Sequence, residues 1–325
     1  MIIFIRYAMK GYRLKCFVII NAKFYGFFLI RCNEINYPKY GTYKIHVLTD
    51  QIIMIKVVKN LYQYRELIAA LAWKNIVIRY KQAYLGVLWA VLKPIMLMLI
   101  FTLVRSFVGI ESDDIPYPIL TFAALIPWVF FQESASEGVS SVTSNAVLIK
   151  KIYFPREVFP ITAMVTKTVE LAISFVILAG MMIYYKMVPT VYALWVPAII
   201  FYTMIVALGI SFFGAAVNVY YRDMSQALPV ALSLLMYGSP VMYPLSLVHK
   251  KLIEEQAAGI WSNDLYTLYT LNPLAGIIDT FQRVLLKGLP PDFNALYPGA
   301  ILTLTILPLS YIFFKKAENW FADVI

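Results

Sequence analysis

Charged side chains inside apolar segments are the first residues of this sequence that could do chemistry. Glu133 and Glu137 stand four residues apart in FFQESASEGVSSVTSN, a spacing that places two side chains on the same face of a helix. A carboxylate at membrane depth is costly unless it faces protein or water. Two interpretations stay open: this half of the segment has already left the bilayer, or both carboxylates line a wet cavity.

Lys167 and Glu170 form a second charged pair, three residues apart in the next apolar segment. An ion pair within one helix lowers the cost of each charge in hydrocarbon. We expect a structural pair or a contact between helices. A proton relay is the alternative, although the segment holds no histidine and no further carboxylate. Lys93, next to Pro94, is expected to extend toward the cytoplasmic interface.

Motifs for nucleotides, metals and covalent catalysis are missing from the sequence. It contains no G-x-x-x-x-G-K-[ST] loop, so an ATP-driven function requires a partner subunit. Two cysteines, Cys16 and Cys32, and two histidines, His46 and His249, provide no zinc spacing and no catalytic triad. We therefore expect no catalytic residue, bound metal or cofactor on this chain.

The composition indicates a membrane protein. Of the 325 residues, 61% are hydrophobic and only 14% are charged, whereas soluble domains usually carry about 25% charged residues. The net charge of +10 does not favour nucleic acid as a partner, because the basic residues are scattered between apolar runs. In a membrane protein, such an excess is typical of cytoplasmic loops near membrane lipids.

Six apolar stretches are long enough to cross a hydrocarbon core of ~30 Å. Basic residues alternate between their connections, which predicts that both termini are cytoplasmic. The connection after the first stretch is acidic, with Glu111, Asp113 and Asp114, and the next is basic, with Lys150 and Lys151. The predicted spans are residues 85–107, 117–141, 158–184, 193–220, 226–243 and 297–314.

Three other segments complete the predicted all-α membrane fold. Residues 61–84 have the pattern of an amphipathic helix at the inner membrane interface. Between spans five and six, LNPLAGIIDTFQRVLL is too short to span and predicts short re-entrant helices. Residues 1–53 show no clear period, so we expect an extension that precedes a true start at Met54 or is poorly ordered. The expected domains are therefore 1–53, 54–84 and 85–325.

The segment LIKKIYFPREVFP, residues 148–160, separates spans two and three. One interpretation is a basic cytoplasmic loop with aromatic residues at the interface. The other is a short docking helix, because Pro155 suits a helix start, Glu157 suits a first turn, and Tyr153 and Phe154 are expected to be exposed. Aromatic and arginine side chains commonly anchor protein interfaces.

Several motifs, in order, resemble those of type-two ABC transporter permeases. They are YLGVLWAVLKPIMLMLIFTLV, then IPWVFFQESASEGVSSVTSNAVLIKKIYFPREVFP, then NVYYRDM, SPVMYP and LNPLAGIID. More narrowly, the chain resembles the branch that exports lipid-linked polysaccharides such as O-antigen, capsule or teichoic acid. The resemblance covers about residue 60 to the end, and residues 1–53 have no counterpart in it.

The resemblance implies a six-span transport subunit, not an enzyme, in the bacterial cytoplasmic (inner) membrane. It implies a homodimer with two ABC ATPase subunits, which bind ATP and magnesium, and a polyprenyl-diphosphate-linked glycan as substrate. The helix in residues 61–84 is similar to the family's cytoplasmic gate. The implied contacts with the ATPase are Lys150, Lys151, Tyr153, Phe154, Pro155, Arg156 and Glu157, and the channel or gate candidates are Arg79, Trp89, Phe130, Phe131, Glu133, Glu137 and Tyr237.

Three other functions remain as alternatives at this stage. The first is an ABC exporter of a drug or small lipid. The second is a gradient-driven carrier that uses Lys167 and Glu170. The third is a membrane-bound enzyme that modifies glycans, although no convergent cluster of aspartate, histidine and arginine outside the spans favours it.

Overall fold

The computed structural model describes ten stretches of the chain. These are residues 2–9, 12–19, 29–32, 35–37, 41–43, 62–81, 88–109, 115–152, 154–257 and 264–324. The chain divides into two units, Met1–Arg65 and Glu66–Ile325.

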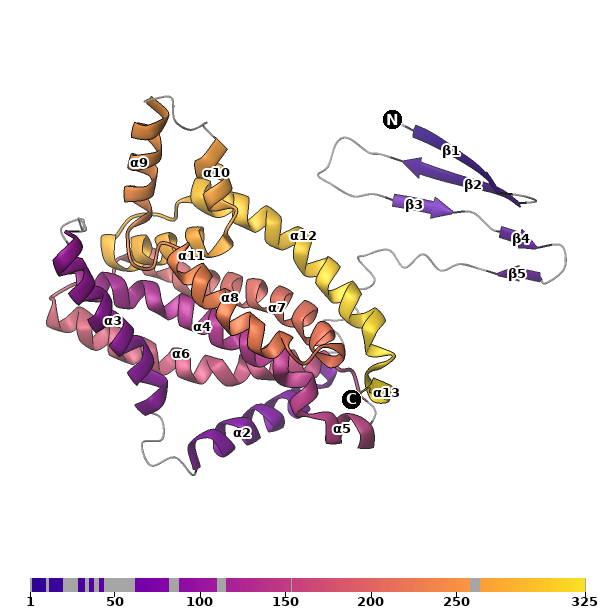
Figure 1. Cartoon of the computed structure of the whole chain (residues 1–325), viewed down its shortest axis with the longest axis horizontal. Helices are drawn as coiled ribbons and strands as arrows, with labels where there is room; N and C mark the ends of the chain where they lie inside the picture. Colours follow the sequence, from indigo (N-terminus) through magenta and orange to yellow (C-terminus); the bar gives the residue numbers. More distant parts are fainter. Residues whose placement is uncertain are drawn as a thin grey trace. The chain divides into compact units, whose positions relative to one another are not determined.

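The first unit contains five short β-strands (Figure 1). Strands β1 (Ile2–Met9), β2 (Tyr12–Ile19) and β3 (Leu29–Cys32) form an antiparallel sheet in the order β1-β2-β3, with Cys16 opposite Cys32. Strands β4 (Ile35–Tyr37) and β5 (Gly41–Tyr43) form an antiparallel pair. These strands differ from the expected extension without a clear period. Their isoleucine, valine, phenylalanine and tyrosine residues are types that favour strands.

The described part of the second unit is helical, which confirms the all-α prediction for it. Short 3-10 and π-helices, η1 and η2, adjoin α7 and α11. The elements are α2 (Arg65–Lys81), α3 (Leu88–Val108), α4 (Tyr117–Ser144), α5 (Ala146–Lys151), α6 (Val158–Tyr184), η1 (Val191–Trp195), α7 (Val196–Tyr220), α8 (Met224–Tyr237), α9 (Leu245–Ala257), α10 (Asp264–Thr270), α11 (Pro273–Gln282), η2 (Arg283–Lys287), α12 (Phe293–Glu318) and α13 (Phe321–Val324).

Helix α4 is the centre of this unit, and α3, α6, α7, α8 and α11 pack around it (Figure 1). Its side chains Phe122, Trp128 and Phe131 are almost completely buried. Close packing of α4 on α7 depends on Gly138, because a Cβ atom there would overlap the side chain of Ser211. The residues of α4 that carry charge are therefore held on the most enclosed helix of the unit.

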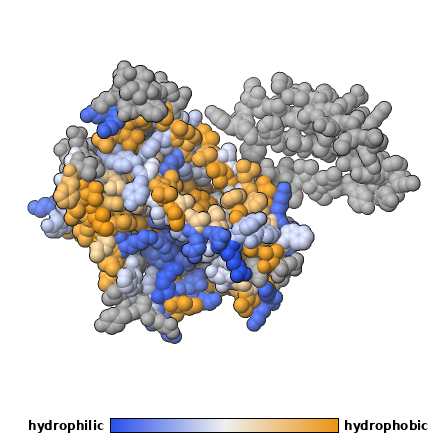
Figure 2. All heavy atoms as spheres, viewed as in Figure 1, coloured by the Kyte–Doolittle hydropathy of each residue, from blue (hydrophilic) through white to orange (hydrophobic). Residues whose placement is uncertain are grey.

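Four of the six predicted spans are confirmed as helices long and apolar enough to cross a membrane. In the described part of the chain these are Tyr117–Ser144, Val158–Tyr184, Val191–Tyr220 and Phe293–Glu318. Helix α3 has 21 residues and occupies the place of the first predicted span. Hydrophobic residues cover much of the visible surface, and hydrophilic residues gather on the side where α2 lies (Figure 2).

The helix at the fifth predicted span is shorter than the span predicted for residues 226–243. Helix α8 has 14 residues and ends at Tyr237, although the apolar run continues to residue 243. Gly238 and Pro240 follow, and glycine and proline both disfavour continuation of a helix. Helices α9, α10 and α11 occupy the region where short helices were predicted, and a re-entrant position for them stays a prediction.

Replacing Gly138 tests the close approach of α4 and α7. We expect Gly138→Ala to lower the Tm of the purified chain in detergent, because the new methyl group costs about 1–3 kcal/mol of overpacking. Gly180→Ala is the matched control, since nothing lies within 4 Å of a Cβ atom at that helical glycine. Equal Tm values for the two variants would contradict the packing described here.

Candidate functional site

Six charged side chains from four helices form one connected ion network. Each is within ion-pair distance of at least one opposite charge in the group. The group contains three cations and three carboxylates, so its formal charges balance. The members are Arg79 of α2, Lys93 of α3, Glu133 and Glu137 of α4, and Lys167 and Glu170 of α6.

Lys167 is the centre of this network. Its Nζ atom lies 3.0 Å from a carboxylate oxygen of Glu170, 3.3 Å from one of Glu133 and 3.5 Å from one of Glu137. Only 6% of the Lys167 side chain is exposed. Burying an ammonium group is costly unless opposite charges compensate it, and three carboxylates from two helices do so here. The predicted pairing of Lys167 with Glu170 is therefore confirmed as part of a larger group.

Arg79 connects helix α2 to the network. Its guanidinium binds Glu137, at 2.6 Å, and also Glu170. Burial alone would lower the pKa of Arg79, but the two carboxylates outweigh it and raise that pKa above its usual value. Among its described residues, α2 buries only Ile68 and Ala72. These two ion pairs therefore link α2 to both α4 and α6.

Lys93 completes the network on α3. It forms an ion pair with Glu133, whereas the sequence led us to expect a side chain extended toward the interface. Glu137 lines a cavity, as one of the two interpretations expected, and whether this part of α4 lies outside the bilayer stays a prediction. Both carboxylates bind cations from neighbouring helices, and their side chains are 31% and 22% exposed.

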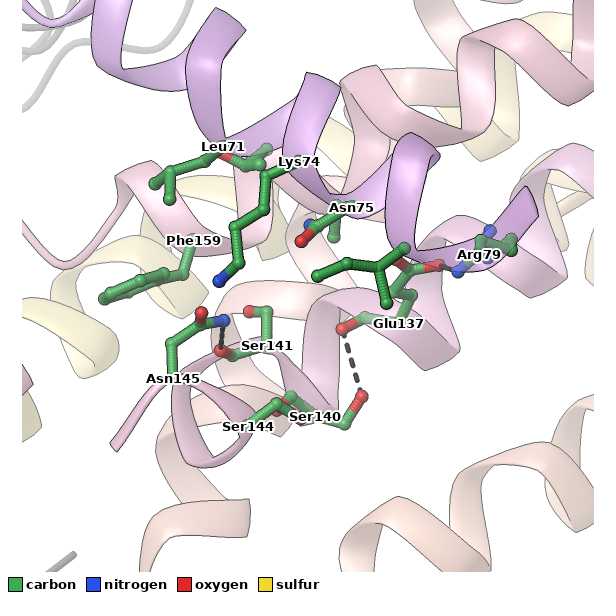
Figure 3. Close-up of a pocket in the computed structure, with 13 residues that line it drawn as sticks. Leu71, Lys74, Asn75, Arg79, Glu137, Ser140, Ser141, Ser144, Asn145 and Phe159 are labelled. Carbon is green, nitrogen blue, oxygen red and sulfur yellow. Dashed lines mark hydrogen bonds and ion pairs between the residues drawn. The ribbon is translucent and has the colours of Figure 1, made fainter. Parts of the chain in front are cut away.

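A cavity of about 360 Å³ lies beside the network, between α2, α4 and α6. Figure 3 shows the Lys74 side chain reaching into it toward Asn145, and Arg79 meeting Glu137 near its other end. The wall formed by α4 is polar, with the hydroxyl groups of Ser140, Ser141 and Ser144. The space leaves α2 without close packing along part of its length.

A second ion cluster fastens the segment between α4 and α6 to α12. Lys315 binds Glu157, and its Nζ atom lies 2.7 Å from a carboxylate oxygen of Glu318. The backbone N–H of Arg156 donates to Glu318 at 2.9 Å. Because Glu157 directly precedes α6, the start of α6 and the end of α12 are held together.

The predicted docking residues divide into an exposed and a buried group. Lys150 and Lys151 are exposed on α5, whereas Phe154, Arg156 and Glu157 are 4%, 7% and 1% exposed. The expectation that Phe154 is exposed is wrong, because its ring packs against Phe159 with centroids 5.3 Å apart.

The helical part of this segment also differs from the prediction. Pro155 is partly buried and does not begin a helix, since α6 starts at Val158 and α5 ends at Lys151. Tyr153 lies outside the described residues. Two exposed apolar residues that the sequence analysis missed, Val147 and Ile152, flank the lysines of α5.

The channel candidates also divide by burial. Phe130 and Phe131 are 4% and 1% exposed, so they belong to the core of the chain and have no surface left for a channel wall between subunits. Their assignment to the wall is therefore corrected, because α4 is enclosed by its neighbours on nearly all sides. Trp89 and Tyr237 are both 58% exposed, and their place in a channel stays a prediction.

The sequence of the helical unit matches a known family. The sequence model of ABC-2 type transporters matches residues 66–254, more than half of the chain. The chain belongs to the ABC-2 type transporter family. The matched region includes all six residues of the ion network and helix α5.

This ABC-2 chain is similar over nearly the full length of several curated proteins. It is 28% identical over 273 residues to the O-antigen export system permease protein RfbA of Myxococcus xanthus, covering 84% of this chain and 100% of the relative. The RfbA protein of Klebsiella pneumoniae is 26% identical over 274 residues, covering 83% and 99%. The polysialic acid transport protein KpsM of Escherichia coli is 23% identical over 258 residues, covering 78% and 93%.

Removing the central cation of the network tests its charge balance. We expect Lys167→Met to destabilise the fold by about 3–5 kcal/mol, because one buried carboxylate then lacks a compensating charge. Folded yield and Tm in detergent are the measurements. Lys250→Met, at an exposed position of α9, is the matched control.

Restoring neutrality separates charge balance from lost packing at this site. The double variant Lys167→Met with Glu170→Gln should recover a large part of the lost Tm. If Lys167→Met behaved like Lys250→Met, the network would not carry the stabilising role assigned to it.

Proposed function

We propose that this chain is the membrane subunit of an ABC exporter that moves a polysaccharide outward across the bacterial cytoplasmic membrane. The observation that carries the proposal is the similarity to O-antigen export permeases over 99–100% of their length. Membership of the ABC-2 family and several apolar helices support it. The sequence has no phosphate-binding loop, so separate ATPase subunits bind ATP and magnesium and supply the energy.

In this proposal the chain crosses the membrane six times, with α3 and α8 completing the set of spans, and both termini are cytoplasmic. Two copies form the pore along the exposed apolar faces of α3 and α8. These faces include Leu99 and Leu103 of α3 and Val230, Leu234 and Tyr237 of α8, all of which are largely exposed. Apolar faces without a partner in one chain can bind a second copy or lipid.

The proposed substrate is a glycan attached to a polyprenyl diphosphate. A long polymer needs weak, repeated contacts, since a tight site would stall it. Exposed aromatic side chains such as Trp89 and Tyr237 are suited to such contacts with sugar rings. No cofactor on this chain takes part.

Helix α5 is the proposed contact with the ATPase. Its exposed residues Val147, Lys150, Lys151 and the following Ile152 combine apolar and cationic groups. Phe154, Arg156 and Glu157 have a different role here, because they are buried: Arg156 and Glu157 join this segment to α12, and Phe154 packs against Phe159 of α6. A displacement of α5 is then passed to α6 and α12 together.

Helix α2 is the proposed cytoplasmic gate. Arg79 holds it to Glu137 of α4 and Glu170 of α6, and the adjacent cavity provides space for a shift. Burial and the nearby charge of Glu170 raise the pKa of Tyr80 to about 12, so this tyrosine stays neutral at physiological pH. Opening requires exchange of these ion pairs for contacts with water or substrate.

Deleting the gene for this chain tests the proposed function. We expect loss of polysaccharide from the cell surface and accumulation of lipid-linked glycan on the cytoplasmic side, because export and not synthesis is blocked. Surface labelling of glycan and extraction of lipid-linked intermediates are the measurements. Expression of the chain from a plasmid should restore export.

The same strain distinguishes the alternatives. Normal surface glycan together with loss of drug or lipid export would contradict the proposal. Transport that persists after ATP depletion and stops when the proton gradient is dissipated would favour a gradient-driven carrier instead.

A further inference from the structure

Helix α5 is too small to form a stable docking surface by itself. It has six residues and is therefore about 9 Å long. Specific protein interfaces usually involve about 20–30 residues on each side. The contact with the ATPase assigned to α5 under the proposed function therefore needs neighbouring surface from the same chain.

The C-terminal helix α13 provides such a neighbour. Helices α5 and α13 contact each other and lie at the same end of the helical unit (Figure 1). Phe321 anchors α13, since it is completely buried and its ring lies 5.4 Å from that of Phe314. Two other side chains at this end, Trp320 and Val324, are 62% and 44% exposed.

The distance of Trp320 from the apolar part of α12 argues against a membrane anchor. Five residues, KKAEN, separate Trp320 from Phe314, the last residue of the apolar run. At 1.5 Å per helical residue, Trp320 lies about 9 Å beyond Phe314. The headgroup layer is only about 5–7 Å thick on each side of the hydrocarbon core. In the orientation proposed above, a tryptophan at this height lies beyond the headgroup layer on the cytoplasmic side.

The exposed side chains at the end of the helical unit where α5 and α13 meet favour a protein partner with carboxylates at the edge of its contact surface. This end carries exposed cations, Lys150 and Lys151 in the last turn of α5 and Lys316 in the last turn of α12, together with exposed apolar side chains such as Val147 and Val324. Tryptophan is among the residues that most often dominate binding energy at protein interfaces. Cations around such an anchor favour a partner with carboxylates and increase the rate of association.

We infer that α5 and α13 form one composite docking surface for the ATPase subunit, with Trp320 as its C-terminal anchor. The α5–α13 surface consists of Val147, Lys150, Lys151, Ile152, Trp320 and Val324. The inference rests on the proposed function, which makes the ATPase the partner of α5. The ion cluster of Lys315, Glu157 and Glu318 holds the two parts of the surface in a fixed relation.

Affinity of the purified chain for its ATPase subunit tests the inference. Trp320→Ala should weaken binding in detergent at least tenfold, with an unchanged Tm. Phe201→Ala is the matched control, because Phe201 is 63% exposed on α7 and lies outside the α5–α13 surface. A photo-crosslinking amino acid at position 320 should capture the ATPase subunit in the assembled complex.

The outcomes separate this inference from the proposed function. Val147→Asp changes α5 alone and tests the primary contact. If Val147→Asp abolishes binding while Trp320→Ala binds normally and position 320 captures only lipid or nothing, the composite surface is wrong and the proposed function survives. If neither variant affects binding, α5 is not the contact and the coupling part of the proposed function also fails.

Discussion

The arrangement of the helical unit depends on keeping six charges paired at the junction of four helices. The most buried of them, Lys167 and Glu170, would be destabilising without a partner, whereas Lys93 is 47% exposed. Together the six charges balance, but only when α2, α3, α4 and α6 occupy their observed places. Such a network specifies a geometry more than it adds stability, because well-packed apolar residues could give similar stability without this requirement.

Helix α6 connects the network to the second ion cluster, which joins the start of α6 to the end of α12. Glu157 precedes its first turn and binds Lys315 of α12, whereas Glu170 binds Arg79 of α2. The two carboxylates are thirteen residues apart in sequence, which corresponds to about 20 Å along a helix. A rigid helix with one ion pair at its start and another near its middle can pass a displacement at α5 to α2, which is the connection that the proposed ATP-driven gate requires.

The sequence predicted the type of fold and the presence of buried charges, but not their partners. Hydropathy is sufficient to locate long apolar helices such as α4 and α6, and the spacing of Glu133 and Glu137 is sufficient to place them on one face. The spacing does not say which helix that face contacts, so Lys93 was not recognised as a partner. The available signal was that each carboxylate in the apolar segments needs a cation nearby, and Lys93 is one of the few cations there.

Burial was the least predictable property of the candidate residues. Phe154 was predicted to lie on a docking surface and Phe130 on a channel wall, yet both fill the core. An aromatic residue has the same sequence signature in a core and on a docking surface, and only packing of distant segments distinguishes them. The length of helix α8 was also mispredicted. The apolar run continues past Tyr237, and hydropathy alone does not mark the position where Gly238 and Pro240 end the helix.

The most direct test of this account measures whether the charge network holds α2 on the bundle. Spin labels are attached at two exposed positions, Ala70 of α2 and Val169 of α6, after Cys16 and Cys32 have been replaced by serine. Pulsed electron paramagnetic resonance then measures the distance between the two helices. The account predicts a narrow distance distribution for the otherwise unchanged chain in complex with its ATPase, and a broader, longer one when Arg79→Gln is added. Identical narrow distributions for both proteins would contradict it.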